Sequence, residues 1–228
     1  MRLTQLFMTR AGLILGVAVL ATLSTAAGAE TSAVTPAQAL ARLMMGNQRF
    51  QKNKLGHPDL DPTRREALVG GQSPFAVILS CSDSRVPPEL VFDQGLGDLF
   101  DVRLAGNTVT RAGLESIDYA VSHLGTNLIL VLGHDSCGAV KGALTECASK
   151  PGAQLPEIFA NICPAVEQAR QKSATDLESA AINLNVSEQV KILERSSLFR
   201  TRVSDGRLKV VGARYNLESG KIEILSGD

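Results

Sequence analysis

Three residues that commonly bind metal ions stand in two short segments of this sequence. Cys81 opens the run CSDSR, and His134 and Cys137 frame the run HDSC. Two thiolates and one imidazole form a ligand set that zinc prefers in catalytic sites, where three protein ligands leave a fourth position open. The residue types therefore predict one zinc ion held by Cys81, His134 and Cys137.

An acid and a guanidinium group follow the first thiol closely. Asp83 can accept a hydrogen bond from a water molecule on the metal, and Arg85 can hold that carboxylate in place and ionised. The alternative interpretation is a surface ion pair of little consequence. Because both residues stand beside a predicted ligand, we interpret Asp83 and Arg85 as catalytic.

The four cysteines also raise the question of disulfides. In an oxidising compartment, Cys81 and Cys137 would tend to pair with each other instead of binding a metal. Cys147 and Cys163 allow two interpretations, a second disulfide or two small buried hydrophobic residues. The sequence does not supply the Cα separation that a disulfide requires, so both questions stay open at this level.

The composition is that of an ordinary globular domain. The 228 residues are 44% hydrophobic and 20% charged, and the formal net charge is +0. This length suits a single domain. A nucleic-acid partner would call for a basic face, which this charge balance does not favour. A small or weakly charged substrate fits better.

The N-terminal segment differs from the rest of the chain. Arg2 and Arg10 supply positive charge, residues 11–23 form an apolar run too short for a comfortable membrane span, and residues 27–29 give a small-x-small cleavage pattern. We interpret residues 1–29 as a secretory signal peptide, with an uncleaved membrane anchor as the alternative. The mature chain would then be exported, to the bacterial periplasm in this interpretation, without a stable membrane span.

The predicted ligands follow two apolar runs. Residues 75–79 and 128–132 are continuous apolar segments, as expected for strands buried on both faces of a parallel sheet, and residues 99–103 are a weaker strand candidate. A helical stripe over residues 114–124 connects the last two of these runs, which predicts a parallel crossover. Cys81 and His134 each stand just beyond a strand, where open α/β sheets bind their ligands.

The remaining periodicity completes an α/β fold. Helical patterns cover residues 157–172 and roughly 187–194, and residues 208–215 and 222–225 predict a C-terminal hairpin. Before the first strand, a cap and proline at positions 35 and 36 begin one helix, and a shorter one follows. We predict one α/β domain over residues 30–228, with a central, mainly parallel sheet flanked by helices. Residues 30–70 would form an N-terminal helical arm able to pack on another subunit.

The two motifs together resemble the β-class carbonic anhydrases. The resemblance rests on CSDSR at 81–85 with the run HDSCG that ends at Gly138, and it extends from about residue 41 to the final hairpin. Shorter matches lie along the chain: GQSP at 71–74, GDLF at 97–100, AGN at 105–107, IDYA at 117–120 and VGA at 211–213. Paired motifs at this spacing are far more specific than either alone.

The resemblance implies roles for individual residues. Zinc would be bound by the two thiolates and the imidazole, and its fourth position would hold water or, in a resting form of the family, the carboxylate of Asp83. The family also implies a homodimer or a dimer of dimers, whose N-terminal helices embrace the neighbouring subunit. A narrow substrate cleft at the dimer interface would be lined by Gln72, Phe100, Tyr119 and Gly138.

The implied reaction is the reversible hydration of carbon dioxide to bicarbonate and a proton by zinc-bound hydroxide. One rival is a related hydrolase of carbon disulfide or carbonyl sulfide, for which the sequence offers no clear discriminator. Another is a non-enzymatic protein that binds zinc or bicarbonate, against which the presence of both Asp83 and Arg85 speaks.

Two positions depart from the family pattern. Asp101 stands where an apolar residue is expected, and Leu104 stands where many members have asparagine. We expect Asp101 to face solvent, although it could instead alter the field near the cleft. The chain has no tryptophan, which argues weakly against the allosteric bicarbonate pocket of some members.

Overall fold

The computed structural model describes residues 34–149 and 156–226. The predicted signal peptide, residues 1–29, lies outside the described residues. Among the described residues, no helix is both long and apolar enough to cross a membrane.

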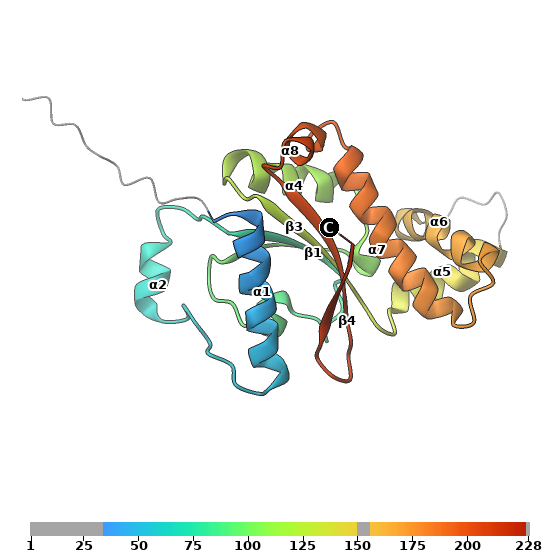
Figure 1. Ribbon diagram of the computed structural model, residues 1–228, viewed down its shortest axis with the longest axis horizontal. Coiled ribbons are helices and arrows are strands. Elements are labelled where there is room, and N and C mark those ends of the chain that lie inside the picture. The colour runs from blue at the N-terminus through green and yellow to red at the C-terminus, as the bar shows by residue number, and fades with distance from the viewer. Residues whose placement is uncertain (1–33, 150–155, 227–228) are drawn as a thin grey trace, which may run out of the picture. The chain divides into compact units, whose positions relative to one another are not determined.

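A five-stranded sheet forms the centre of the fold, in the spatial order β2-β1-β3-β4-β5 (Figure 1). The first four strands in this order run parallel to their neighbours, and only β4 and β5 pair antiparallel. This arrangement confirms the predicted α/β domain with a mainly parallel sheet. The strands are β1 (Ala76–Ser80), β2 (Leu99–Arg103), β3 (Leu128–His134), β4 (Lys209–Tyr215) and β5 (Ile222–Ser226).

The two apolar runs of the sequence occupy central positions in the sheet. Every residue of β1 and of β3 is buried, because helices cover both faces of the sheet there. Continuous burial explains why these strands read as unbroken apolar runs and not as alternating patterns. One boundary differs from the prediction: His134 is the last residue of β3 and does not lie beyond it.

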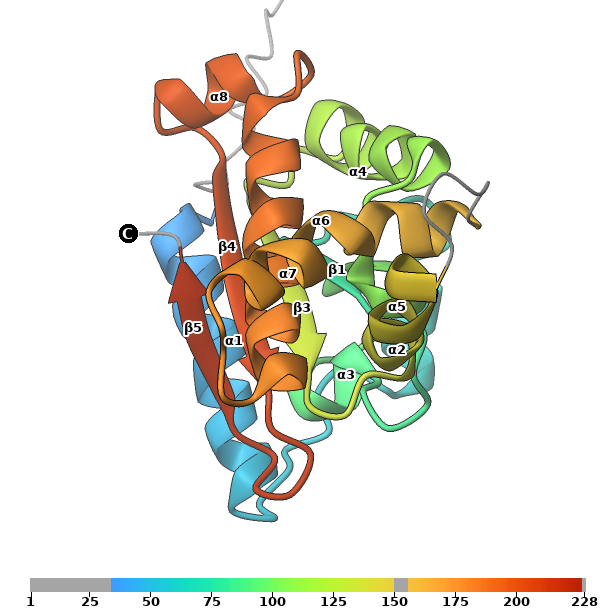
Figure 2. The same ribbon diagram turned by 90° about the vertical axis from the view of Figure 1, so that its right-hand side faces the viewer.

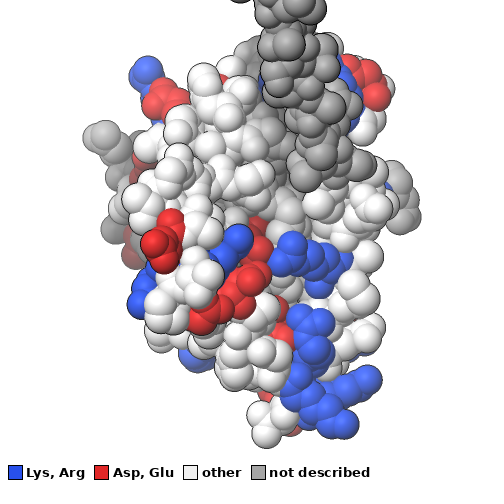
Figure 3. All heavy atoms as spheres, turned by 90° about the vertical axis from the view of Figure 1, so that its left-hand side faces the viewer, with Lys and Arg blue, Asp and Glu red and all other residues white. Residues whose placement is uncertain are grey.

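Helices α1 (Pro36–Gln51) and α3 (Pro88–Val91) cover one face of the sheet (Figure 1). Ala39 and Leu43 of α1 are completely buried in one cluster with Ile78 of β1 and Leu130 of β3. The two helices of the predicted N-terminal arm therefore differ in burial. Helix α1 belongs to the core of its own chain, whereas α2 (Pro62–Ala67) buries none of its residues. Acidic and basic side chains stand next to one another on the side that carries α2 (Figure 3).

Helices α4 (Arg111–His123) and α7 (Leu177–Arg195) cover the opposite face (Figure 2). Helix α7 is longer than the predicted segment 187–194, and the short helix α8 (Arg200–Ser204) follows it. Helices α5 (Gly138–Ser149) and α6 (Glu157–Gln171) pack with α7 in a third cluster, which includes Cys81 and Cys137.

A disulfide joins α5 to α6. Cys147 and Cys163 are bridged with a Cα–Cα separation of 5.7 Å, inside the range that a disulfide requires. Of the two interpretations of this pair, the disulfide is therefore confirmed. It ties together the helix that begins directly after Cys137 and the helix packed on it.

Candidate metal centre and active site

The topology of the sheet brings the three predicted ligands together. Cys81 follows the last residue of β1, His134 ends β3, and Cys137 lies directly before α5. Because β1 and β3 are parallel neighbours, their carboxyl ends lie at the same edge of the sheet. The ligand atoms of the three residues all lie within 4.8 Å of one another. Cys81 and Cys137 are free thiols, so the alternative of a disulfide between them is wrong.

The imidazole of His134 is oriented by the backbone beside it. Its Nδ1 lies 2.8 Å from the carbonyl oxygen of Asp135, a contact in which Nδ1 donates the hydrogen. The other nitrogen, Nε2, is completely buried and has no hydrogen-bond partner among the described residues. A buried polar atom without a partner is costly, and a metal ion at the cluster would supply one. The residues present therefore fit a metal ion.

The hydrogen bond between the two thiols shifts their pKa values in opposite directions. A hydrogen bond from Cys137 lowers the pKa of the Cys81 thiol to about 4, with a further contribution from His134, although burial opposes the shift. The same hydrogen bond, together with burial, raises the pKa of Cys137. Burial lowers the pKa of His134, but its interaction with the nearby Cys81 thiolate outweighs burial, so the net shift is upward. The thiolate form of Cys81 is thus stabilised beside the imidazole of His134.

Asp83 and Arg85 form a two-pronged ion pair against this cluster. Oδ1 of Asp83 accepts from the backbone N–H and from Nε of Arg85, at 2.9 Å each, and Oδ2 accepts from Nη2 at 2.7 Å. The side-chain bonds from Arg85 hold the pKa of Asp83 far below its usual range, so the carboxylate is ionised. Its Oδ2 lies 3.8 Å from Nε2 of His134, beside the cluster and not within it.

Three further hydrogen bonds fix the loop that carries this pair. Arg103, the last residue of β2, donates to the carbonyl oxygens of Cys81 and Asp83 at 3.2 and 2.7 Å. Arg85 also donates to the carbonyl oxygen of Ser136, at 3.3 Å, in the loop that carries the other two ligands. The two ligand loops are therefore tied to each other and to the neighbouring strand.

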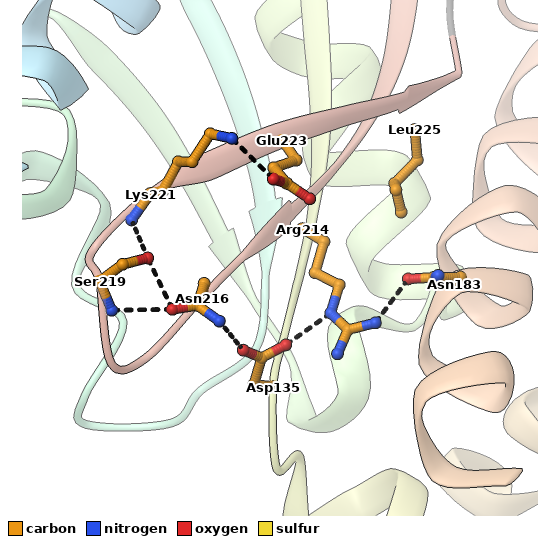
Figure 4. Close-up of a pocket in the computed structure, with 8 residues that line it drawn as sticks. All are labelled: Asp135, Asn183, Arg214, Asn216, Ser219, Lys221, Glu223 and Leu225. Atoms are coloured by element: carbon orange, nitrogen blue, oxygen red, sulfur yellow. Dashed lines mark hydrogen bonds and ion pairs between the residues drawn. The ribbon is translucent and has the colours of Figure 1, made fainter. Parts of the chain in front are cut away.

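A polar network that sequence reasoning missed surrounds Asp135 (Figure 4). Its carboxylate accepts from Nε of Arg214 at 2.5 Å and from Nδ2 of Asn216 at 2.6 Å. Arg214 also donates to the side chains of Ser179 and Asn183 on α7, at 2.7 and 3.0 Å. Apart from Ser179, these residues line a polar cavity of about 370 Å³. The only sequence signal was the acidic residue directly after the histidine ligand.

The predicted cleft residues are not all close to the metal ligands within one chain. Gln72 is exposed and lies before β1, at the opposite end of that strand from Cys81. Phe100 and Tyr119 lie with their ring centres 6.3 Å apart, and Tyr119 is 49% exposed. Gly138 directly follows Cys137, and a Cβ atom there would meet open space. Their assignment as cleft residues stays a prediction that requires a second subunit.

The expectation that Asp101 faces solvent is wrong. Its Oδ1 is buried without a hydrogen-bond partner, and its carboxyl group interacts with Glu89 of α3. Burial, and then the charge and hydrogen bond of Glu89 on α3, raise the pKa of Asp101 to about 8. A nearby arginine, Arg103, opposes this shift only in part.

Comparisons with known proteins agree with this geometry. A model of the carbonic anhydrase family matches residues 76–222. Carbonic anhydrase 2 of Mycobacterium tuberculosis (strain ATCC 25618 / H37Rv) is 41% identical over 189 residues, which cover 82% of this chain and 91% of that protein. The carbonic anhydrase of Mycolicibacterium smegmatis is 38% identical over 84% of this chain and 94% of its own length.

Solved structures give the same result. A Coccomyxa β-carbonic anhydrase in complex with acetazolamide superposes with a TM-score of 0.62 at 26% identity, over 83% of this chain and 87% of that one. A tetrameric β-carbonic anhydrase from Sordaria macrospora also has a TM-score of 0.62, at 25% identity, over 83% of this chain and 98% of that one.

A thiolate and imidazole cluster at the carboxyl edge of a mainly parallel sheet, with an ionised carboxylate beside it, defines a metal-binding α/β enzyme. The chain belongs to the β-class carbonic anhydrases. Enzymes of this family are lyases that hydrate carbon dioxide.

Proposed function

We propose that this enzyme is an exported, zinc-dependent carbonic anhydrase whose metal is held by Cys81, His134 and Cys137. One observation carries the proposal: the three ligand atoms lie within 4.8 Å of one another, with the paired carboxylate of Asp83 only 3.8 Å from the imidazole nitrogen. Zinc suits two thiolates and an imidazole, and three protein ligands leave one position for water.

Zinc in this site would lower the pKa of water in the fourth position toward neutrality and so supply hydroxide for attack on carbon dioxide. Two thiolates add negative charge to the metal and oppose this effect. The chain offsets part of that charge with hydrogen bonds, because the backbone N–H of Gly106 donates to the sulfur of Cys81 at 3.3 Å.

Asp83 acts as the hydrogen-bond acceptor for the nucleophile. An ionised carboxylate accepts only, so it aligns a hydroxyl with its hydrogen toward Asp83 and its lone pair toward the substrate. Arg85 holds both carboxylate oxygens and keeps the acid ionised at neutral pH. If Asp83 instead moved onto the metal as a fourth ligand, these bonds to Arg85 would have to break. The observed pairing supports the open arrangement as the working form.

Asp83→Asn tests this role. The amide keeps the size of the side chain but brings an N–H donor to a site that requires an acceptor, so hydration of carbon dioxide should fall by about 10- to 100-fold. Zinc content should stay at one ion per chain, because Asp83 is outside the ligand cluster. Stopped-flow hydration and metal analysis on the same zinc-loaded samples measure both quantities.

The chain contains its own control for this experiment. Asp205 and Arg207 repeat the Asp-x-Arg geometry, with the backbone N–H and Nε of the arginine both donating to the carboxylate, but this pair is exposed and remote from the ligands. Asp205→Asn should leave turnover unchanged. Full turnover in Asp83→Asn would refute the proposed role of Asp83, and a wild-type chain with bound zinc but no hydration activity would refute the proposed function.

We further propose that the chain works as a homodimer or as a dimer of dimers, with the cleft between subunits. Two observations support this assembly: Gln72 lies at the far end of β1 from the ligands, and the similar Sordaria macrospora enzyme is tetrameric. Light scattering on the purified enzyme tests it, and a monomer at catalytic concentrations would contradict it.

Export rests on two observations. The charged and apolar pattern of residues 1–29 is typical of a signal peptide, and the Cys147–Cys163 disulfide is typical of proteins in oxidising compartments. Fractionation of producing cells, with mass spectrometry of the N-terminus, tests the proposal. A chain recovered from the cytoplasm with residues 1–29 still attached would contradict it.

A further inference from the structure

The sulfur of Cys81 receives a hydrogen bond from outside the ligand set. The backbone N–H of Gly106 donates to it at 3.3 Å, from the short 3₁₀ turn η1 (Ala105–Asn107). Gly106 has a φ of +69°, a conformation that favours glycine, and a Cβ there would lie 2.7 Å from Ile162. The direction of this N–H thus depends on how firmly the η1 turn is held.

Two buried amide side chains of α7 hold the η1 turn. Asn185 donates through Nδ2 to the carbonyl oxygen of Gly106 at 2.8 Å. Gln189, one helical turn later, donates to Oδ1 of Asn185 at 3.1 Å and accepts the backbone N–H of Val109 at 2.7 Å. Asn185 is 1% exposed and Gln189 is 0% exposed. The pair therefore joins both ends of the segment that faces the Cys81 sulfur.

We propose that Asn185 and Gln189 are positioning residues for the metal centre, which hold Gly106 so that its N–H donates to the Cys81 sulfur. This inference rests on the proposed zinc site. A hydrogen bond to a thiolate withdraws electron density that the sulfur would otherwise give to the metal, so it makes the metal a stronger Lewis acid. Such tuning matters more here than at an all-histidine site, because two of the three ligands are thiolates.

A structural role alone would not produce this effect, and the chain provides a comparison. Asn47 on α1 is also completely buried and also donates to backbone carbonyl oxygens, those of Val91 and Gly220, at 3.0 and 2.8 Å. Its Oδ1 accepts the backbone N–H of Ile222 at 3.1 Å. Asn47 thus matches Asn185 in type, burial and bonding, but it lies on the α1 side of the sheet and not against the η1 turn.

The test uses the full-length enzyme loaded with cobalt(II), whose thiolate-to-metal charge-transfer absorption reports the electron density on the cysteine sulfurs. Asn185→Leu and Gln189→Met should shift this absorption to longer wavelength, because the sulfur that loses the N–H bond donates more readily. Asn47→Leu should leave the absorption in place even if it lowers the melting temperature as much. With zinc, kcat for hydration should fall about 10-fold in the two α7 variants.

If Asn185→Leu does not fold, Asn185→Ser is used instead. It removes the side-chain amide that donates to Gly106 but creates less strain. An unshifted absorption in a folded, cobalt-loaded Asn185 variant overturns the inference, as does a wild-type chain that binds no cobalt. The proposed function is judged separately. If the α7 variants shift the absorption but the zinc-loaded wild type does not hydrate carbon dioxide, the positioning role is supported and the proposed function is refuted. If the wild type is active but the variants show no shift, the proposed function is supported and the positioning role is refuted.

Discussion

The same local motif occurs twice in this chain with different surroundings. Asp83 with Arg85 and Asp205 with Arg207 both form an acid–guanidinium pair two residues apart, with almost the same hydrogen bonds. Only the first pair stands beside buried ligands, so only its carboxylate can act on a molecule at the metal. At the scale of single residues, the chemistry depends on what lies within about 4 Å of the motif, within which opposite charges strongly perturb each other.

The orientation of His134 depends on residues that never reach the metal. Its Nδ1 bonds to the carbonyl oxygen of Asp135, and the carboxylate of Asp135 is held by Arg214 and Asn216. An outer contact of this kind fixes which imidazole nitrogen faces the ion. The β4 strand therefore contributes to the site although it provides no ligand.

Arg214→Gln should weaken the hold on zinc. The substitution removes the charged partner of Asp135 and leaves the ligand loop free to move, so zinc should leave about 10-fold faster in the presence of a chelator, measured with a chromogenic zinc indicator. Arg207→Gln removes a comparable ion pair from an exposed site and should leave the release rate unchanged. Equal release rates in wild type and Arg214→Gln would show that the network does not position His134.

At the scale of the elements, the register between β1 and β3 determines that the predicted ligands lie close together. Ser80 of β1 pairs with Leu132 of β3, so the residues that follow these two strands emerge at one edge of the sheet. On the neighbouring strand β2, Asp101 pairs with Ile78 of β1 and its carboxyl group interacts with that of Glu89 on α3. Two carboxyl groups in contact cannot both ionise freely, so one of them retains a proton.

The pKa of Asp101 predicts a pH-dependent stability. Because burial raises this pKa from 3.8 to about 8, the folded chain holds a proton that the unfolded chain releases across that range. Stability contributed by the protonated acid is fully present below pH 3.8 and is lost as the pH rises through 8. The asparagine in Asp101→Asn cannot ionise. The unfolding free energy of this variant relative to wild type should therefore increase from pH 5 to pH 9, by on the order of 1–2 kcal/mol.

Urea unfolding of wild type and Asp101→Asn at the two pH values measures this gain. The expected gain is smaller than the full pKa shift would give, because Asp101 is only partly buried and its surroundings can relax. Glu115→Gln, at an exposed carboxyl group on α4, should show no growth of the difference with pH. A difference between wild type and Asp101→Asn that is constant from pH 5 to pH 9 would contradict the assignment.

At the scale of the whole molecule, a single chain does not bring all of the predicted cleft residues to its own metal ligands. Gln72 and Cys81 stand at opposite ends of β1, and the strand between them spans about 16 Å at 3.3 Å per residue. A side chain at Gln72 therefore cannot serve the metal of its own chain. In a two-fold dimer, each subunit can offer the same residue to its neighbour's site.

Mixed dimers test whether the cleft is shared. Cys81→Ser removes a predicted ligand, and Gln72→Ala removes a predicted cleft residue, so each variant alone should lose most of its activity. A dimer that contains one copy of each variant has one site with both defects and one site with neither, so it should recover about half of the wild-type activity. Co-expression with two different tags isolates this species for stopped-flow assay. Activity no higher than that of Gln72→Ala would show that Gln72 acts within its own chain or not at all.

Several features were accessible to sequence reasoning for a physical reason. Strands buried on both faces must be apolar throughout, so β1 and β3 were visible as continuous runs. Ligand chemistry limits a thiolate and imidazole site to few residues, which made Cys81, His134 and Cys137 visible as a set. Fixed local offsets, such as the cap at Thr35 and the antiparallel hairpin of β4 and β5, were also correctly predicted.

Other features depend on distances between segments that are remote in the sequence, and only the tertiary structure decided them. The disulfide required the Cα atoms of Cys147 and Cys163 to lie 5.7 Å apart, which no spacing of residues specifies. The inward direction of Asp101 depends on the face of β2 that α3 covers. Sequence alone therefore indicated which residues could hold a metal ion, because that follows from the chemistry of the ligand types. Their outer support, from Arg214 to Asn185, follows from packing, which is fixed only when the whole chain is folded.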